Sequence, residues 1–325
     1  MNRPPNASRL AYWITRFLNH KRALGYTYQG PAFILEALRR HTERCGGGDL
    51  NEQCFESWMA GYQDHHPNTR RKWYLTVRYF CLYRRRSEPG CFLPSSIGVP
   101  KGQPYVSPVI VEPEQIARVL HLASQLSPTK KSPLRAPTLR VAIVLLYTCG
   151  LRAGELRRLT VGDIEEQGTV LRILDSKFHK SRLVPLSVSA SRELQTYLQQ
   201  RQEVFAVEPD TPLLCTRYRG RSHRYSHPGL RKSILQLFEA AGVRDGQGRR
   251  PRVHDLRHSF AMQALIRWYR DGADVQVSLP KLAIFMGHVS IKYTAYYLHW
   301  IPTVQGLASD RFEQQFGQFV KGGDL

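Results

Sequence analysis

The stretch RVHDLRHSFA, residues 252–261, brings three basic or titratable side chains close together. On a helix, residues three and four apart share a face, so His254 and Arg257 would point the same way, with His258 beside them. Imidazolium and guanidinium groups are both good phosphate ligands. The spacing therefore indicates either a phosphate clamp or the charged face of a surface helix, and the rest of the chain has to decide between the two.

Two upstream segments carry further cations. Arg152 lies in the mostly apolar stretch TCGLRAGEL, where a buried guanidinium needs an anion or a carboxylate such as that of Glu155. Lys177 and Lys180 lie in DSKFHKSRLVPL, at an expected hairpin turn. A lysine on a turn is either simply solvated or a mobile cationic group that reaches a phosphate, and this segment alone leaves both interpretations open.

A downstream segment, FMGHVSIKYTAYYLH, combines a histidine with candidate nucleophiles. His288 follows a glycine, in an expected loop before a short helix. Tyr293, Tyr296 and Tyr297 follow on that helix. Tyrosines in helices usually serve packing, but a tyrosine hydroxyl at a cationic site is able to attack a phosphodiester.

The first 86 residues are expected to be helical, because apolar residues recur at every third or fourth position. The expected helices cover residues 8–25, 31–48, 51–62 and 66–86. The last of them should be capped at Asn68 or Thr69. Its apolar side includes Trp73 and Phe80, and its basic side consists of Arg70, Arg71, Lys72, Arg78, Arg84, Arg85 and Arg86. A solvated face is the ordinary interpretation, but the charge of the whole chain favours contact with the DNA backbone.

Residues 87–111 hold five prolines and no helical period, which predicts an extended linker. The remainder mixes helices with one hairpin. Helices are expected over about 112–126, 136–150 continuing to about 159, 190–203, 228–241, 254–269, 280–286 and 303–319, and strands over 169–174 and 182–186. This pattern predicts a mainly α chain with a small antiparallel β-sheet, that is, an α+β fold.

The net charge of +21 and the pI near 10.0 indicate a polyanionic partner, and nucleic acid is the usual one. No run of about 18 apolar residues exists and the N-terminus has no apolar secretory segment, so we expect no membrane span and a cytoplasmic location. The six cysteines form no C-x-x-C pair and are expected to be idle thiols, with neither disulfides nor zinc implied. His223 and His227, four residues apart, lack further candidate ligands.

In order along the chain, six residues resemble the catalytic set of the tyrosine recombinase (phage integrase-type) family: Arg152, Lys177, His254, Arg257, His288 and Tyr297. The contexts GLRAGEL, RLVPL, HDLRHSFA and GHVSIKYTAYY are similar to segments of that family, whose nucleophile lies ten residues after the glycine of the last segment. The resemblance implies a helical, SAM-like DNA-binding domain over residues 1–90, a linker over 91–111 and a catalytic domain over 112–325. It also implies a transposon- or plasmid-borne integrase or recombinase of bacterial type, which would be associated with the nucleoid in the cytoplasm.

The resemblance implies a site-specific recombinase that cuts and rejoins DNA through a 3′-phosphotyrosine. Tyr297 would attack the phosphate, while Arg152 and Arg257 neutralise its oxygens. His254 would handle the tyrosine proton, His288 would donate a hydrogen bond to the phosphate, and Lys177 would protonate the departing 5′ oxygen. The phosphotyrosine conserves the bond energy, so we expect no ATP. Since cationic side chains replace Mg²⁺, we expect neither a metal nor any other cofactor.

The expected partner is double-stranded DNA, bound by a homotetramer on two sites, with or without related recombinases and accessory proteins. DNA-contacting residues would be Arg70, Arg71, Lys72, Arg78 and Lys180. An apolar stripe over 303–319 predicts a helix that packs either within its own chain or into a neighbouring protomer.

Two departures and two rival functions remain at this point. The 31 positions from Arg257 to His288 exceed the family's usual spacing, so we interpret residues 267–282 as a loop insertion. A register shifted by one residue would make Tyr296 the nucleophile. A type IB topoisomerase would use a similar set without site preference. A decayed recombinase would only bind DNA, although six intact residues argue against decay.

Overall fold

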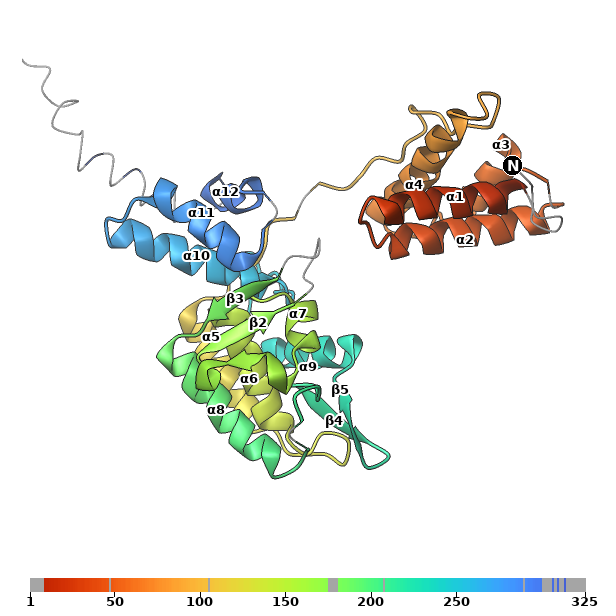
Figure 1. Cartoon of the computed structure of the whole chain (residues 1–325). Helices are drawn as coiled ribbons and strands as arrows, with labels where there is room; N and C mark the ends of the chain where they lie inside the picture. Colours follow the sequence, from red (N-terminus) through yellow and green to blue (C-terminus); the bar gives the residue numbers. More distant parts are fainter. Residues whose placement is uncertain are drawn as a thin grey trace, which may run out of the picture. The chain divides into compact units, whose positions relative to one another are not determined.

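The computed structural model describes residues 9–46, 48–104, 106–174, 181–206, 208–288 and 290–299, together with Gly306, Ser309 and Glu313. For Lys292, Tyr296 and His299 it describes the backbone alone. The chain forms two compact units that divide after Val106, inside the segment predicted to be a linker (Figure 1). The predicted fold class is confirmed, because the described part is mainly helical with small antiparallel sheets.

Unit 1 is a group of four helices, as the apolar periodicity predicts. They are α1 (Arg9–Ala23), α2 (Gln29–Arg44), α3 (Glu52–Ala60) and α4 (Pro67–Arg85). Their apolar faces meet in a core that includes Phe17, Leu35, Leu38, Trp58, Val77 and Phe80. The predicted cap of α4 is wrong. His66 is the N-cap, with its Nδ1 accepting from the Asn68 N–H at 3.2 Å, because Pro67 suits the first helical position and moves the start forward.

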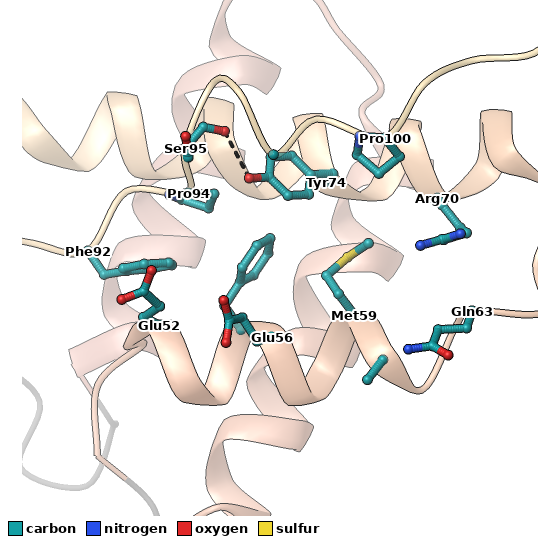
Figure 2. A pocket seen from close by; sticks show the side chains of 13 residues that line it. Glu52, Glu56, Met59, Gln63, Arg70, Tyr74, Phe92, Pro94, Ser95 and Pro100 are labelled. Atoms are coloured by element: carbon teal, nitrogen blue, oxygen red, sulfur yellow. Dashed lines mark hydrogen bonds between the residues drawn. The ribbon is translucent and has the colours of Figure 1, made fainter.

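Part of the predicted linker packs on unit 1 as extended chain. Tyr74 Oη donates to the Ser95 carbonyl at 2.8 Å, and Phe92 packs against the core of the unit. A pocket of about 340 Å³ remains between this segment and α3, with Glu52 and Met59 on its α3 side (Figure 2). The linker is therefore partly tied down, and α4 supplies the anchor.

Unit 2 is built around α6 (Arg135–Thr148), which is almost entirely buried from Thr138 to Leu146 apart from Arg140, and which packs against α5 (Pro113–Ser124), α8 (Val188–Gln202) and α10 (Asp255–Arg270). The other helices of the described part are α7 (Ala153–Arg158), α9 (His227–Ala240), α11 (Val275–Met286), α12 (Lys292–His299) and two short 3₁₀ turns, Val161–Asp163 and Glu166–Gly168. A helix whose apolar residues lie on nearly all sides is typical of a buried core element.

The predicted hairpin is confirmed as β2 (Val170–Ile173) and β3 (Arg182–Pro185), which pair antiparallel with Ile173 opposite Arg182. A third strand that the sequence did not predict, β1 (Ile164–Glu165), joins the other edge of β2. A second hairpin, also not predicted, pairs β4 (Cys215–Tyr218) with β5 (Arg221–Arg224). The β2–β3 connection, with Lys177 and Lys180, lies outside the described residues.

The interpretation of residues 267–282 as a loop insertion is wrong. Helix α10 continues to Arg270 and α11 begins at Val275, so only four residues form the turn. Gly272 adopts φ +68°, and the Asp274 carboxylate caps α11 by accepting from two backbone N–H groups. Pro280 lies inside α11 without ending it. The additional residues between Arg257 and His288 are therefore mostly helical, and they lengthen α10 and α11.

Across the described residues, no helix has the length and apolar character that crossing a bilayer requires. Of the predicted 303–319 helix only three residues are described, so its docking stays a prediction.

Candidate active site

The first turn of α10 is fixed by a buried carboxylate. Asp255 Oδ2 accepts from the backbone N–H of Arg252 at 2.9 Å and from that of Val109 at 3.4 Å. This holds the start of the helix against the segment that precedes α5. His254 is therefore the N-cap residue and Arg257 lies in the first turn, on the side that faces the core.

Arg257 is 2% exposed, and its guanidinium bridges two chain segments. Nη1 donates to the Gly150 carbonyl after α6, and Nη2 donates to the Met286 carbonyl at the end of α11. Gly150 must be glycine, because its φ is +58° and a β carbon there would lie 2.5 Å from the Phe260 ring. Burial and the charge of Arg152 lower the pKa of Arg257 to about 9, so the group stays cationic at neutral pH.

Arg152 reaches the same place from the start of α7. Its Nη2 donates to the Gly287 carbonyl at 3.0 Å, and its Nη1 donates to Glu155. The structure therefore bears out the pairing with Glu155, but this carboxylate is shared. Arg182 of β3 donates to it through both terminal nitrogens and also donates to the Phe285 carbonyl at 2.8 Å.

Glu155 is buried, and its charge holds the two arginines in place. Burial alone would raise its pKa, but hydrogen bonds from Arg182 and from the Arg152 backbone, with both positive charges, lower the pKa to about 2. Gly287, at φ +67°, leaves room for Arg182, whose Nη1 would lie 2.8 Å from a β carbon at this position. Among the described residues, Arg152 and Arg182 share Glu155 and Arg252 pairs with Asp255, so two carboxylates face four guanidiniums and an excess of positive charge remains at the site.

Three histidines surround this cationic centre. His254 is exposed, while His258 and His288 are half-buried. The rings of His254 and His258 meet edge to face at 4.9 Å between centroids. Desolvation lowers all three pKa values, to about 4 for His258, where His254 adds to the effect, and to about 3 for His288, where Arg257 adds to it. His258 and His288 are therefore neutral in the free protein at neutral pH.

Among the described side chains, Tyr297 on α12 brings its hydroxyl to the site, while the side chain of Tyr296, the alternative nucleophile, lies outside the described part. Its side chain is 2% exposed, and Oη lies 2.8 Å from His258 Nδ1. Tyr293, one turn earlier, is 64% exposed. His288 Nδ1 lies 2.7 Å from the Thr294 hydroxyl, so α12 also orients this imidazole.

A basic pocket of about 340 Å³ opens beside Arg152 and His254. Its other lining residues are Ala153, Gly154, Arg157, His227, Leu230, Arg231, Arg252 and Val253, with no carboxylate among them. The buried Nε of Arg157 has no hydrogen-bond partner in the described part of the chain. This lining fits an anion with several negative charges. His227 is part of this lining, at the start of α9.

Five of the six residues proposed for catalysis thus surround one centre, namely Arg152, His254, Arg257, His288 and Tyr297, and the sixth, Lys177, lies outside the described residues. The sequence reasoning gave no role to Arg182, and it mentioned His258 without assigning it a function. The RH pair of HDLRHSFA was the available signal for His258. Nothing in the sequence pointed to Arg182, because its partner Glu155 is 27 positions away.

The residues predicted to contact DNA on α4 divide into two groups. Arg70 is half-buried and Lys72 is exposed. Arg71 donates to the Pro100 carbonyl at 3.0 Å and Arg78 donates to the Pro94 carbonyl, so both already hold the linker.

Arg84 does not belong to the solvated face on which the sequence placed it. It is 2% exposed and pairs with Asp49 and Glu88. Glu88, four residues further along the chain, and Asp49, which precedes α3, hold this side chain in a buried position. The helical period of α4 alone does not reveal these two partners.

Comparisons with known proteins give a consistent result. Residues 110–302 match the model of the phage integrase family. Two proteins of Sinorhizobium fredii, both named as integrase/recombinases, are similar. One, y4rB, is 34% identical over 74% of this chain and 76% of its own length, and the other, y4rE, is 29% identical over 95% and 96%. Among solved structures, the Tn1549 transposon integrase in complex with a circular intermediate DNA is similar with a TM-score of 0.62 at 16% identity, covering 94% of this chain and 99% of that one.

Proposed function

The chain belongs to the phage integrase family of tyrosine recombinases, and on this premise we propose that it is a site-specific recombinase that cuts and rejoins DNA through a 3′-phosphotyrosine. The observation that carries the proposal is the buried Tyr297 hydroxyl, which lies 2.8 Å from His258 Nδ1. This histidine directly follows Arg257, which lies at the centre of the cationic site. An excess of buried positive charge destabilises the empty site, and a phosphodiester would relieve it.

In the cleavage step, Tyr297 Oη forms a bond to phosphorus while the bond from phosphorus to the 5′ oxygen breaks. The guanidiniums of Arg152 and Arg257 stabilise the charge on the non-bridging oxygens. His254 and His288 donate to the same phosphate. The Thr294 hydroxyl supports this role, because donation to His288 Nδ1 would leave Nε2 as the proton-bearing nitrogen.

We assign the tyrosine proton to His258 in place of His254. The hydroxyl of Tyr297 already lies at hydrogen-bond distance from His258 Nδ1, and the low pKa of His258 means that its ring is free to accept. Lys177 is proposed to protonate the departing 5′ oxygen. Attack by a 5′ hydroxyl on the phosphotyrosine then reverses each step, so strand joining consumes no ATP.

The proposed partner is double-stranded DNA. The basic pocket of Arg157, Arg231 and Arg252 is suited to phosphates next to the one that is cut, and Lys180 and the basic side of α4 would contact the backbone further away. We propose that four protomers assemble on two sites. A type IB topoisomerase would act on DNA of any sequence as a single protomer.

Capture of the covalent adduct tests the proposal. Wild type and Tyr297→Phe are produced in cells that carry the native DNA, denatured and purified, and the attached DNA is sequenced. Tyr293→Phe is the matched control, because that tyrosine lies on the same helix and is exposed. We expect one discrete sequence from wild type and from the control, and none from Tyr297→Phe.

Other outcomes have defined meanings. Attached DNA of random sequence would favour the topoisomerase. An adduct that persists in Tyr297→Phe would refute the assignment of the nucleophile. If no adduct forms in cells, the protein is incubated in vitro with a nicked duplex that carries the native ends. Cleavage then releases the short 5′ strand next to the nick, so the phosphotyrosine cannot be reversed and is trapped. Failure there too would leave a protein that only binds DNA.

A further inference from the structure

Three metal-binding side chains come together in unit 1, in the part of the chain that the proposed catalysis does not use. They are His41, Cys45 and Cys54, and one ligand atom from each lies within 4.8 Å of the others. Cys54 is buried, His41 is half-buried and Cys45 is exposed. The cluster thus opens to solvent on the side of Cys45.

The positions of the three residues follow from the two helices that carry them. His41 and Cys45 are four residues apart at the end of α2, so they share a face. Cys54 lies in the first turn of α3, where the Asn51 side chain accepts from its backbone N–H at 2.8 Å. Cys45 follows the last turn of α2 and precedes Gly46, which has φ +106° and open space around its α carbon. The exposed thiol is therefore free to adjust, while the buried one is held.

The donor set selects the kind of metal. Two soft thiolates and one imidazole suit zinc, whereas magnesium and calcium prefer oxygen ligands. Zinc binds sulfur at about 2.3 Å and nitrogen at about 2.0 Å, so tetrahedral ligand atoms lie roughly 3.5–4 Å apart. The three ligand atoms already lie within 4.8 Å of one another, so small side-chain rotations would bring them to this spacing.

We propose that His41, Cys45 and Cys54 bind one zinc ion that joins the end of α2 to the start of α3, with water in the fourth position. Two thiolates balance the charge of Zn²⁺ without a carboxylate. Neighbouring hydroxyls orient the ligands, since Ser57 Oγ lies 2.7 Å from His41 Nε2 and Thr42 Oγ1 lies 3.5 Å from Cys54 Sγ. The sequence gives no hint of this site, because the ligand spacing matches no common zinc motif.

Cobalt titration of the full-length protein tests the site. The protein is kept reduced with a phosphine, stripped with a chelator and titrated with Co²⁺. We expect a thiolate-to-cobalt charge-transfer band and tetrahedral d–d bands that saturate at one equivalent and disappear when Zn²⁺ is added. The histidines of unit 2 cannot produce the thiolate band, and cysteine variants decide which thiols do.

The variants separate a metal site from a folding defect. Cys45→Ser changes an exposed residue and should fold, yet we expect it to lose the thiolate band and to bind Zn²⁺ at least roughly 100-fold more weakly. It should also lose the rise in Tm that Zn²⁺ gives the wild type. Cys54→Ser should behave alike, and Cys91→Ser, a half-buried cysteine outside the cluster, should behave as wild type.

Three results would overturn the proposal. The first is the absence of a thiolate band in the reduced wild type. The second is a band that survives in Cys45→Ser. The third is a disulfide between Cys45 and Cys54 that forms in air and is not prevented by bound Zn²⁺, because a zinc-bound thiolate pair resists oxidation. Formation of the covalent adduct on DNA does not depend on any of these three results, so the zinc site and the proposed catalysis are tested independently.

Discussion

Glu155→Gln removes the one buried carboxylate that holds Arg152 and Arg182 together. The glutamate side chain is 1% exposed, and its pKa of about 2 lies below the ordinary 4.5. A lowered pKa means that the unfolded chain takes up the proton first. The carboxylate therefore stabilises the folded state fully above pH 4.5 and loses this effect as the pH falls to about 2.

The size of the effect follows from the same shift. A difference of this size corresponds to about 3 kcal/mol at pH 7 and about 1 kcal/mol at pH 3. Breaking a buried ion pair and leaving Arg182 charged and 9% exposed gives the same order of magnitude, about 3–5 kcal/mol. We expect Glu155→Gln to lower the free energy of unfolding of unit 2 by about 3 kcal/mol at pH 7.

Urea denaturation of wild type and variant at several pH values between 7 and 3 measures this difference. The matched control is Glu193→Gln, whose partner Arg140 is 35% exposed, and it should change stability by less than about 1 kcal/mol. A loss at pH 7 no larger than that of the control, or a loss that stays constant down to pH 3, would refute the reasoning.

The remaining predictions concern other parts of the structure. In urea denaturation, Gly150→Ala should destabilise the protein by about 2–4 kcal/mol and Gly272→Ala by about 1–2 kcal/mol. Both positions have positive φ, but only the β carbon at position 150 would clash with the Phe260 ring. Equal losses would contradict this steric argument. Because the pKa of His288 is lowered to about 3, the unfolded chain is protonated first below pH 6.5, so this group should cost wild type about 2 kcal/mol between pH 7 and pH 5. His288→Asn should lack that loss, and unchanged acid sensitivity would argue against it. Arg84→Ala should lower the free energy of unfolding by about 3–5 kcal/mol, because this arginine is buried and paired. Arg86→Ala should leave Tm within about 2 °C and lower the salt dependence of DNA binding. The reverse pattern would place Arg84 on the DNA-contacting face.

Much of the site could be predicted because its residues lie in short segments whose residue types and spacing are informative by themselves. His254 and Arg257 are three apart, within one turn of helix, where spacing determines geometry. The fold class was predictable for the same reason, since the apolar period marks both the helices and the β2–β3 hairpin. Tyr297 was identified by the resemblance to the family, whose nucleophile lies ten residues after the glycine that corresponds to Gly287.

The relations that the sequence could not supply join distant segments. The contact between His258 and Tyr297 links residues 39 positions apart, and the bond from Arg182 to Glu155 links β3 to α7. A helical period also sorts residues only by face. It placed Arg84 with the solvated arginines because nothing in the period reveals that Asp49 lies against α4.

The length between Arg257 and His288 shows a different limit. Pro280 and the run from Asp271 to Asp274 are typical of loops, so the sequence favoured an insertion there. Asp274 instead caps a helix that tolerates its proline, and one helix pair is simply longer. Residue types alone cannot distinguish a long inserted loop from a short turn between two longer helices.

The two carbonyl bonds of Arg257 constrain how a lineage of this protein could lose its activity. The guanidinium that would hold the phosphate also joins the end of α6 to the end of α11, so a mutation there would weaken the fold together with the proposed chemistry. A change of Tyr297 to phenylalanine removes one hydroxyl and leaves the packed ring. Genetic drift should therefore silence such genes through the nucleophile first. If the proposed function holds, an inactive descendant would retain its arginines, and with them the proposed contacts to DNA.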